Sequence, residues 1–117
     1  MVGIDIVSNH RIRQAVERFG DRFLKRIYTE KELEYCKSQQ AYYECLSARW
    51  ACKEAVLKAV YQELGILLRF SEIEVVGNRG KPAWVRIKRE GLEKLKVLVS
   101  LSHERDYSVA VALVSKE

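Results

Sequence analysis

The sequence predicts an α+β fold: one small domain over residues 1–117, in which a mainly antiparallel sheet packs on a long central helix. Three observations lead to this prediction. Residues 45–60 are apolar on nearly every side of a helical wheel and contain neither Gly nor Pro, as expected of a buried helix. A short β-branched segment precedes them, and alternating apolar and polar residues follow them. Strands and helices segregated in this way are typical of α+β folds.

Before the long helix we expect a strand over residues 2–7 and shorter helices. The strand is apolar and β-branched except at Asp5, a residue type that strands disfavour. Residues 8–9 can cap the first helix, and Gly20 can end it, because Gly readily adopts the left-handed conformation of a helix C-terminus. A second helical stretch is expected around residues 23–27, and a third begins with a capping box at residues 29–32 and breaks near residues 38–40.

The long helix is expected over about residues 41–64, with Gly65 as its stop. After it, residues 71–88 are predicted to form a β-hairpin whose turn has the sequence Asn78-Arg-Gly-Lys-Pro82. The remaining elements are expected to be a short helix and two strands, over residues 90–95, 97–102 and 107–115.

Composition excludes several classes of protein. A hydrophobic fraction of 48% and a charged fraction of 32% are typical of a soluble globular chain. No apolar run approaches the roughly 20 residues of a membrane-spanning helix, and the N-terminus, broken at Asp5, does not resemble a signal peptide. The cysteines, Cys36, Cys45 and Cys52, lack CxxC spacing, so we expect all three to be reduced and buried in a cytoplasmic protein.

Four charged residues interrupt the apolar helix: Arg49, Lys53, Glu54 and Lys58. Burying a charge is costly unless it is paired or binds an ion or a ligand. Glu54 and Lys58 lie one helical turn apart. They could form an ordinary salt bridge on an exposed edge of the helix, or a functional carboxylate–lysine pair.

Asp5 in the first strand and His103 at a strand end are also chemically capable. For Asp5, the structural alternative is a hydrogen bond to local backbone. Two carboxylates with few histidines suit a hard cation such as Mg²⁺, which takes one or two carboxylates and completes its shell with water and substrate phosphates. Together these residues suggest a phosphate-bearing substrate and transfer chemistry that depends on electrostatics.

Four short motifs follow one another along the chain: GIDIV at 3–7, RWACKEAVLKA at 49–59, GKP at 80–82 and LSHE at 101–104. They resemble the successive signature motifs of the 4′-phosphopantetheinyl transferase superfamily. The short chain is similar to the small, single-domain group of that superfamily, the holo-acyl-carrier-protein synthases. The W-x-x-K-E-A-x-x-K core is the most specific of these motifs.

The resemblance implies transfer of the 4′-phosphopantetheine arm of coenzyme A to a serine of apo acyl carrier protein, in fatty acid biosynthesis, with release of adenosine 3′,5′-bisphosphate. It implies that Asp5 and Glu54 hold Mg²⁺ and that Lys58 contacts the diphosphate and steadies the leaving group. Glu54 would be the candidate base for the serine, directly or through a water molecule. The coenzyme A site is expected to include Arg49, Lys58, Gly80, Lys81, Pro82 and His103.

The resemblance also concerns assembly and partners. Because short members of the superfamily form homotrimers with each active site between neighbouring subunits, the resemblance implies a homotrimer for this chain. Residues 9–31 contain seven basic and three acidic residues, which favours an acidic partner such as the carrier protein. The expected docking residues are Arg11, Arg18, Arg22 and Arg26, and the residues expected to face the core are Ile12, Val16, Phe19, Phe23 and Ile27. The alternative is a basic surface that only meets solvent.

A nucleic-acid-binding module is the other class of protein considered. It would explain the net charge of +5 and the basic residues of 79–89. It would not explain Asp5 and Glu54 in apolar contexts, because carboxylates without a metal repel phosphates. We therefore expect neither nucleic acid nor a membrane as a partner. A second alternative is a related transferase whose carrier protein serves polyketide or peptide synthesis, and the sequence does not distinguish these carriers from those of fatty acid synthesis.

Overall fold

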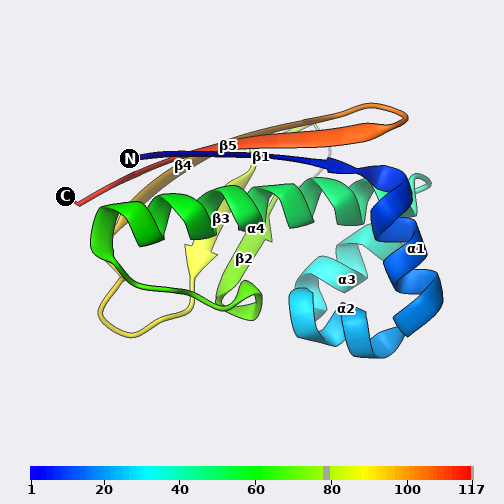
Figure 1. Ribbon diagram of the computed structural model, residues 1–117, viewed down its shortest axis with the longest axis horizontal. Coiled ribbons are helices and arrows are strands. Elements are labelled where there is room, and N and C mark those ends of the chain that lie inside the picture. The colour runs from blue at the N-terminus through cyan, green and yellow to red at the C-terminus, as the bar shows by residue number, and fades with distance from the viewer. Residues whose placement is uncertain (78–79, 117) are drawn as a thin grey trace.

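The computed structural model describes residues 1–77 and 80–116. In it, an antiparallel sheet with the strand order β1-β5-β4 covers one side of the central helix α4 (Tyr42–Leu64) (Figure 1). Its strands are β1 (Val2–Ser8), β5 (Tyr107–Ser115) and β4 (Lys96–His103). A hairpin of β2 (Ile73–Val76) and β3 (Trp84–Ile87) follows the short 3₁₀ turn Phe70–Glu72, and β2 packs on α4. This architecture confirms the predicted α+β fold.

Shorter helices gather at the N-terminal end of α4 (Figure 1). They are α1 (Asn9–Phe19), α2 (Asp21–Ile27) and α3 (Glu30–Lys37). The predicted capping box is present, because Thr29 and Glu32 each accept a hydrogen bond from the other's backbone N–H. Gly65 ends α4 in the left-handed conformation, at a φ of 70°.

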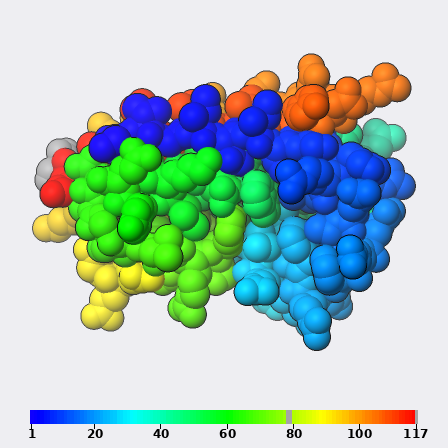
Figure 2. Space-filling model, in the orientation of Figure 1, coloured from blue at the N-terminus to red at the C-terminus, as the bar shows by residue number. Residues whose placement is uncertain are grey.

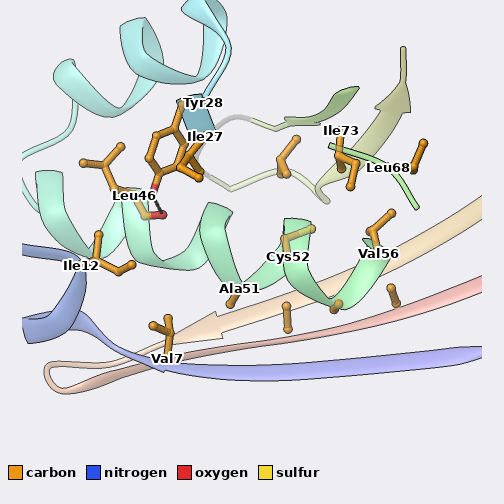
Figure 3. Close-up of a cluster of buried hydrophobic side chains, with 14 of the residues drawn as sticks. Val7, Ile12, Ile27, Tyr28, Leu46, Ala51, Cys52, Val56, Leu68 and Ile73 are labelled. Atoms are coloured by element: carbon orange, nitrogen blue, oxygen red, sulfur yellow. Dashed lines mark hydrogen bonds between the residues drawn. The ribbon is translucent and has the colours of Figure 1, made fainter. Parts of the chain in front are cut away.

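The core runs along α4 (Figure 3). Ala51, Cys52 and Val56 are fully buried in the helix, and Leu46 lies beneath the ring of Tyr28, whose hydroxyl donates a hydrogen bond to the Leu46 carbonyl. The continuous apolar surface predicted for residues 45–60 is therefore explained by layers packed on several sides of one helix.

The face of the β1-β5-β4 sheet that points away from α4 is apolar and exposed. Because neighbouring residues of a strand point to opposite faces, every second residue of β1 lies on this side. We call it the outer sheet face; its exposed apolar residues are Val2, Ile4, Ile6, Leu98, Val111 and Leu113. Contiguous exposed apolar patches of this kind are uncommon on small monomeric domains. Among the described helices, none has the length and apolar character needed to cross a membrane.

The helix predicted for residues 90–95 is wrong. These residues form turns around Gly91, whose φ is 92°. The side chain of Glu93 accepts a hydrogen bond from the Gly91 N–H, and such local contacts between side chain and backbone compete with helix formation. In the predicted hairpin turn 78–82, residues 78–79 lie outside the described residues, and Gly80 has a φ of 84°.

The prediction of three reduced cysteines is also wrong. Cys36, near the end of α3, forms a disulfide with Cys45, in the first turn of α4. The break between the two helices folds the chain back, so that the two Cα atoms lie 5.5 Å apart, a separation that a disulfide spans. Cys52 is buried and keeps a free thiol in the described structure.

Candidate functional site

Asp5, Glu54 and Lys58 meet where β1 crosses α4, and we call them the β1–α4 cluster. The Lys58 Nζ lies 3.0 Å from Asp5 Oδ1 and also donates a hydrogen bond to the Ile4 carbonyl at 3.3 Å. Glu54 lies one helical turn before Lys58 and is half-buried. The structure therefore brings the predicted catalytic residues together, with Lys58 paired to Asp5. In Figure 2 the atoms of β1 (blue) and α4 (green) meet at the surface of the molecule.

The close approach of β1 to α4 depends on small residues. A Cβ atom at Gly3 would collide with the carbonyl oxygen of Ala55 and would crowd the methyl group of Ala59. The side chain of Asp5 points to the same side of β1 as Gly3, because the two residues are two positions apart in a strand. Gly3 thus allows Asp5 to reach the helix that holds Glu54 and Lys58.

The electrostatics of the β1–α4 cluster are unbalanced. Burial raises the pKa of Glu54, the negative charge of Asp5 raises it further, and the ammonium of Lys58 lowers it. The second carboxylate oxygen of Asp5, Oδ2, is buried and finds no hydrogen-bond partner within residues 1–77 and 80–116. A buried polar atom without a partner costs free energy, and so do two carboxylates that repel each other.

These features fit a divalent cation. A hard ion such as Mg²⁺ accepts one or two carboxylates from the protein and fills its other positions with water and phosphate oxygens. Asp5 and Glu54 supply that number of carboxylates. The described part of the chain contains no group of three or more His, Cys, Asp or Glu residues that could hold a metal by itself. The remaining ligands of an ion at this place would therefore come from water or a phosphate.

A separate cleft of about 600 Å³ lies on another side of α4. It is lined by residues of α3, α4, β4 and the loop around Gly80. Four of the residues predicted to bind coenzyme A are among its walls: Arg49, Gly80, Lys81 and His103. Pro82 and Lys58, also predicted for this role, are not among the described residues that line it.

Arg49 gives this cleft a fixed positive charge. Its guanidinium is mostly buried, and its Nη2 donates a hydrogen bond to the Gly77 carbonyl at 3.1 Å. The ring of Tyr35 lies 4.4 Å from the guanidinium carbon, as in a cation–π contact. Burial lowers the pKa of Arg49, although an arginine keeps its charge at neutral pH. Such a group suits phosphate oxygens.

Within the described residues, the β1–α4 cluster and the cleft share no residue. Arg49 and Lys58 are nine residues apart on α4, which places them about half a turn apart at about 100° per residue. Asp5 lies on β1, at one edge of the sheet, and His103 lies on β4, at the opposite edge. The predicted catalytic residues and the predicted nucleotide residues therefore face different sides of the molecule.

Lys53, one of the four charges of the apolar helix, has a different role. Its Nζ lies 2.7 Å from Glu32 Oε1, and it also donates hydrogen bonds to the carbonyls of Phe70 and Ile73. The other oxygen of Glu32 accepts a hydrogen bond from the Val75 N–H. Both side chains are fully buried. Sequence reasoning missed this pair, because Glu32 was explained completely by its capping box.

The basic surface over α1 and α2 is largely as predicted. Arg11, Arg18, Arg22 and Arg26 are exposed. Ile12 and Ile27 are buried in the core, whereas Val16 and Phe23 are half-buried. The prediction for Phe19 is wrong: its side chain is 51% exposed and lies against the guanidinium of Arg18. Burial along this side of α1 falls from Ile12 through Val16 to Phe19, the last residue of the helix, so the end of α1 extends beyond the core.

Comparisons with known proteins show which family this chain resembles. Residues 1–112 match the family model of the 4′-phosphopantetheinyl transferase superfamily. The holo-acyl-carrier-protein synthase of Aquifex aeolicus is 61% identical over 121 residues, which cover 100% of this chain and 99% of that protein. The synthase of Hydrogenobaculum sp. is 44% identical, with coverage of 100% and 97%. The crystal structure of the Helicobacter pylori synthase in complex with coenzyme A matches with a TM-score of 0.84 at 30% identity, covering 98% of this chain and 100% of that one.

Proposed function

We propose that this chain, which belongs to the 4′-phosphopantetheinyl transferase superfamily, is a holo-acyl-carrier-protein synthase. It is a transferase that moves the 4′-phosphopantetheine group of coenzyme A to a serine of apo acyl carrier protein, in support of fatty acid biosynthesis. The observation that carries the proposal is the β1–α4 cluster, where two carboxylates and a lysine of the family motifs converge.

The proposed reaction is a displacement at phosphorus. The serine oxygen forms a bond to the phosphorus of the phosphopantetheine arm, and the bond from that phosphorus to the bridging oxygen of the diphosphate breaks. The electron pair leaves with adenosine 3′,5′-bisphosphate. Glu54 is the candidate acceptor of the serine proton, and its raised pKa makes it a stronger base than an exposed glutamate.

Lys58 is placed to follow the charge of the leaving group. Its side chain is 44% exposed, so the ammonium can turn from Asp5 toward a departing phosphate. Asp5 and Glu54 would hold Mg²⁺, which when bound neutralises negative charge on the diphosphate. A bound ion would offset the repulsion between the two carboxylates. We place the nucleotide of coenzyme A in the cleft, with its phosphates on Arg49 and with Gly80, Lys81 and His103 around it. Pro82 would act only by shaping the loop next to Lys81.

We further propose a homotrimer in which each active site lies between two subunits. Two features support this assembly. The cluster and the cleft lie on opposite sides of α4, so one subunit's cluster needs the cleft of a neighbour. The outer sheet face offers exposed apolar surface that a neighbour would bury. Sedimentation equilibrium of the active protein should give three times the chain mass; a monomer mass would refute the trimer.

The partner protein is proposed to dock on the basic surface of α1 and α2. Acyl carrier proteins are acidic, and Arg11, Arg18, Arg22 and Arg26 present exposed positive charge to them. We retain a single domain over residues 1–117 and a cytoplasmic location as part of the proposal. The Cys36–Cys45 disulfide is unusual for a cytoplasmic protein, because the cytoplasm keeps most thiols reduced.

Intact-mass spectrometry tests the proposed function. An apo acyl carrier protein is incubated with coenzyme A, Mg²⁺ and the full chain. The expected result is a carrier that gains the mass of one phosphopantetheine group, with adenosine 3′,5′-bisphosphate as the second product. A carrier of unchanged mass after incubation with the folded protein would refute the proposal. Apo carriers of polyketide and peptide synthases, assayed in parallel, separate the alternative transferases.

A further inference from the structure

A disulfide forms part of the wall of the cleft. Cys45 lines the cleft, and its partner Cys36 is fully buried behind it. The segment between α3 and α4 that this bond closes contributes Gln39, Gln40 and Ala41 to the cleft wall. The bond therefore restrains one side of the cavity that receives the nucleotide in the proposed function.

The same bond restrains the surroundings of Arg49. The Nη1 of Arg49 donates a hydrogen bond to Cys45 Sγ at 3.8 Å. Tyr35, whose ring lies against the guanidinium, is the neighbour of Cys36 on α3. Two of the contacts that hold Arg49 thus come from a disulfide-bonded residue or from the residue next to one. The third contact, to the Gly77 carbonyl, comes from the residue after β2.

We propose that the Cys36–Cys45 disulfide is a positioning element for Arg49, so that the oxidised chain binds nucleotide more tightly than the reduced chain. This inference rests on the proposed placement of the nucleotide in the cleft. Its physical basis is preorganisation: a guanidinium that is already held in place loses less freedom when it binds phosphate. Arg49 would be the residue that touches the nucleotide, and the disulfide would act through it.

Reduction removes this restraint. A dithiol reductant breaks the Sγ–Sγ bond, each sulfur gains one electron and one proton, and the reductant becomes a disulfide itself. The last turn of α3 is then no longer bonded to α4, and Tyr35 can move away from Arg49. Cys52 takes no part, because burial raises the pKa of its thiol to about 12 and makes it unreactive.

Isothermal titration calorimetry with adenosine 3′,5′-bisphosphate tests the proposal on the full chain. This probe has no thiol, unlike coenzyme A, and so cannot exchange with the disulfide. Reduction by dithiothreitol should weaken binding by about five- to tenfold. The double variant Cys36→Ala/Cys45→Ala should bind like the reduced chain with or without reductant. Cys52→Ala is the matched control and should respond to reductant as the parent chain does.

Arg49→Gln distinguishes a positioning role from a general structural one. It should bind weakly in both redox states, because the effect of the disulfide passes through Arg49. Reduction should also leave the KM for the carrier protein unchanged. Equal affinity of the oxidised and reduced parent chains, with weak binding by Arg49→Gln, would overturn the inference and leave the cleft assignment standing. A redox effect of full size in Arg49→Gln would also overturn it. Parent-like affinity of Arg49→Gln would overturn both the inference and the proposed nucleotide site.

Discussion

Helix α4 carries two lysine–carboxylate pairs that differ in almost every physical respect. Lys53 and Glu32 are fully buried, and their other hydrogen bonds are made with backbone groups of Thr29 and residues 70–75. Lys58 and Asp5 lie where β1 crosses α4, and the Lys58 side chain is partly exposed. There, Asp5 keeps an oxygen that has no partner in the described structure, and a second carboxylate, Glu54, stands close by.

The difference teaches how a structural ion pair can be told from a functional one. A pair whose groups are all satisfied by the protein has no capacity left for a ligand, and it joins the helix to β2 and α3. A pair with an unsatisfied atom and excess negative charge is stabilised when a cation binds. Both lysines belong to the same nine-residue motif core, so the motif itself does not separate the two roles.

Loss of a carboxylate from the β1–α4 cluster should have the largest effect. Asp5→Asn and Glu54→Gln should each lower kcat/KM for carrier modification by about a hundred- to a thousandfold, because the groups that hold charge at the reacting phosphate are lost. Reversible inhibition of the parent protein by EDTA should accompany this. Circular dichroism should show an intact fold, and Glu34→Gln, an exposed change on α3, serves as the control. Parent rates from folded Glu54→Gln would refute the assignment.

The buried pair should show the opposite behaviour. Lys53→Met leaves the Glu32 carboxylate buried without its cation and should lower the free energy of unfolding by about 3–5 kcal/mol. Lys58→Met removes a half-exposed pair and should cost less than about 1 kcal/mol. Urea unfolding of the two variants measures this contrast. A Lys53→Met variant at least as stable as Lys58→Met would contradict the predicted contrast.

Gly3→Ala tests the close approach of β1 to α4. The added Cβ collides with the Ala55 carbonyl, so β1 must shift away from α4. We expect a loss of about 1–3 kcal/mol in stability, the usual range for overpacking. We also expect kcat to fall at temperatures where the variant stays folded, since Asp5 moves with β1. Thermal melts and single-turnover rates together check this, and a variant with full stability and full kcat would contradict the close approach.

Charge reversal on the basic surface should weaken only the binding of the carrier protein. Arg11→Glu or Arg22→Glu should raise the KM for the carrier by about tenfold and leave the affinity for coenzyme A unchanged. The parent kcat/KM should fall as salt rises, because exposed charges are screened over about 10 Å at 0.1 M ionic strength. Lys94→Glu, an exposed reversal outside α1 and α2, is the matched control. Weakened coenzyme A binding with an unchanged carrier KM would move these arginines to the nucleotide site.

The smallest effect concerns the pH dependence of stability. Because the folded-state pKa of Glu54 is raised, this group favours the folded state most below its unfolded pKa, and that contribution is lost as pH rises through the folded value. Glu54→Gln should therefore have a slightly higher Tm than the parent near pH 7 and a flatter dependence of Tm on pH. Melting curves between pH 4 and pH 8 check the sign, and a lower Tm for Glu54→Gln at pH 7 would contradict it.

The sequence allowed the fold and the cluster to be predicted where local pattern or motif carried the information. Asp5, Glu54 and Lys58 meet as the motifs indicated, although Lys58 pairs with Asp5, from a distant strand, rather than with its helix neighbour Glu54. That partner choice depends on how closely β1 crosses α4, which Gly3 controls and which no local pattern reports.

Long-range geometry explains the features that were missed. The disulfide depends on the chain reversal after α3, which brings Cys36 back to Cys45. The buried pair depends on α3 packing beside α4, so that Glu32 serves a helix cap and Lys53 at once. Neither arrangement follows from spacing along the chain, because each requires the relative placement of two helices.

Binding of Mn²⁺ tests most directly whether the β1–α4 cluster is built to hold a cation. The loss of the free-ion electron paramagnetic resonance signal is followed as the full chain is added in the presence of coenzyme A. The parent chain and Glu34→Gln should bind the ion equally, and Asp5→Asn and Glu54→Gln should bind it at least about tenfold more weakly. Parent-like Mn²⁺ affinity in folded Asp5→Asn and Glu54→Gln would contradict the distinction between the two pairs.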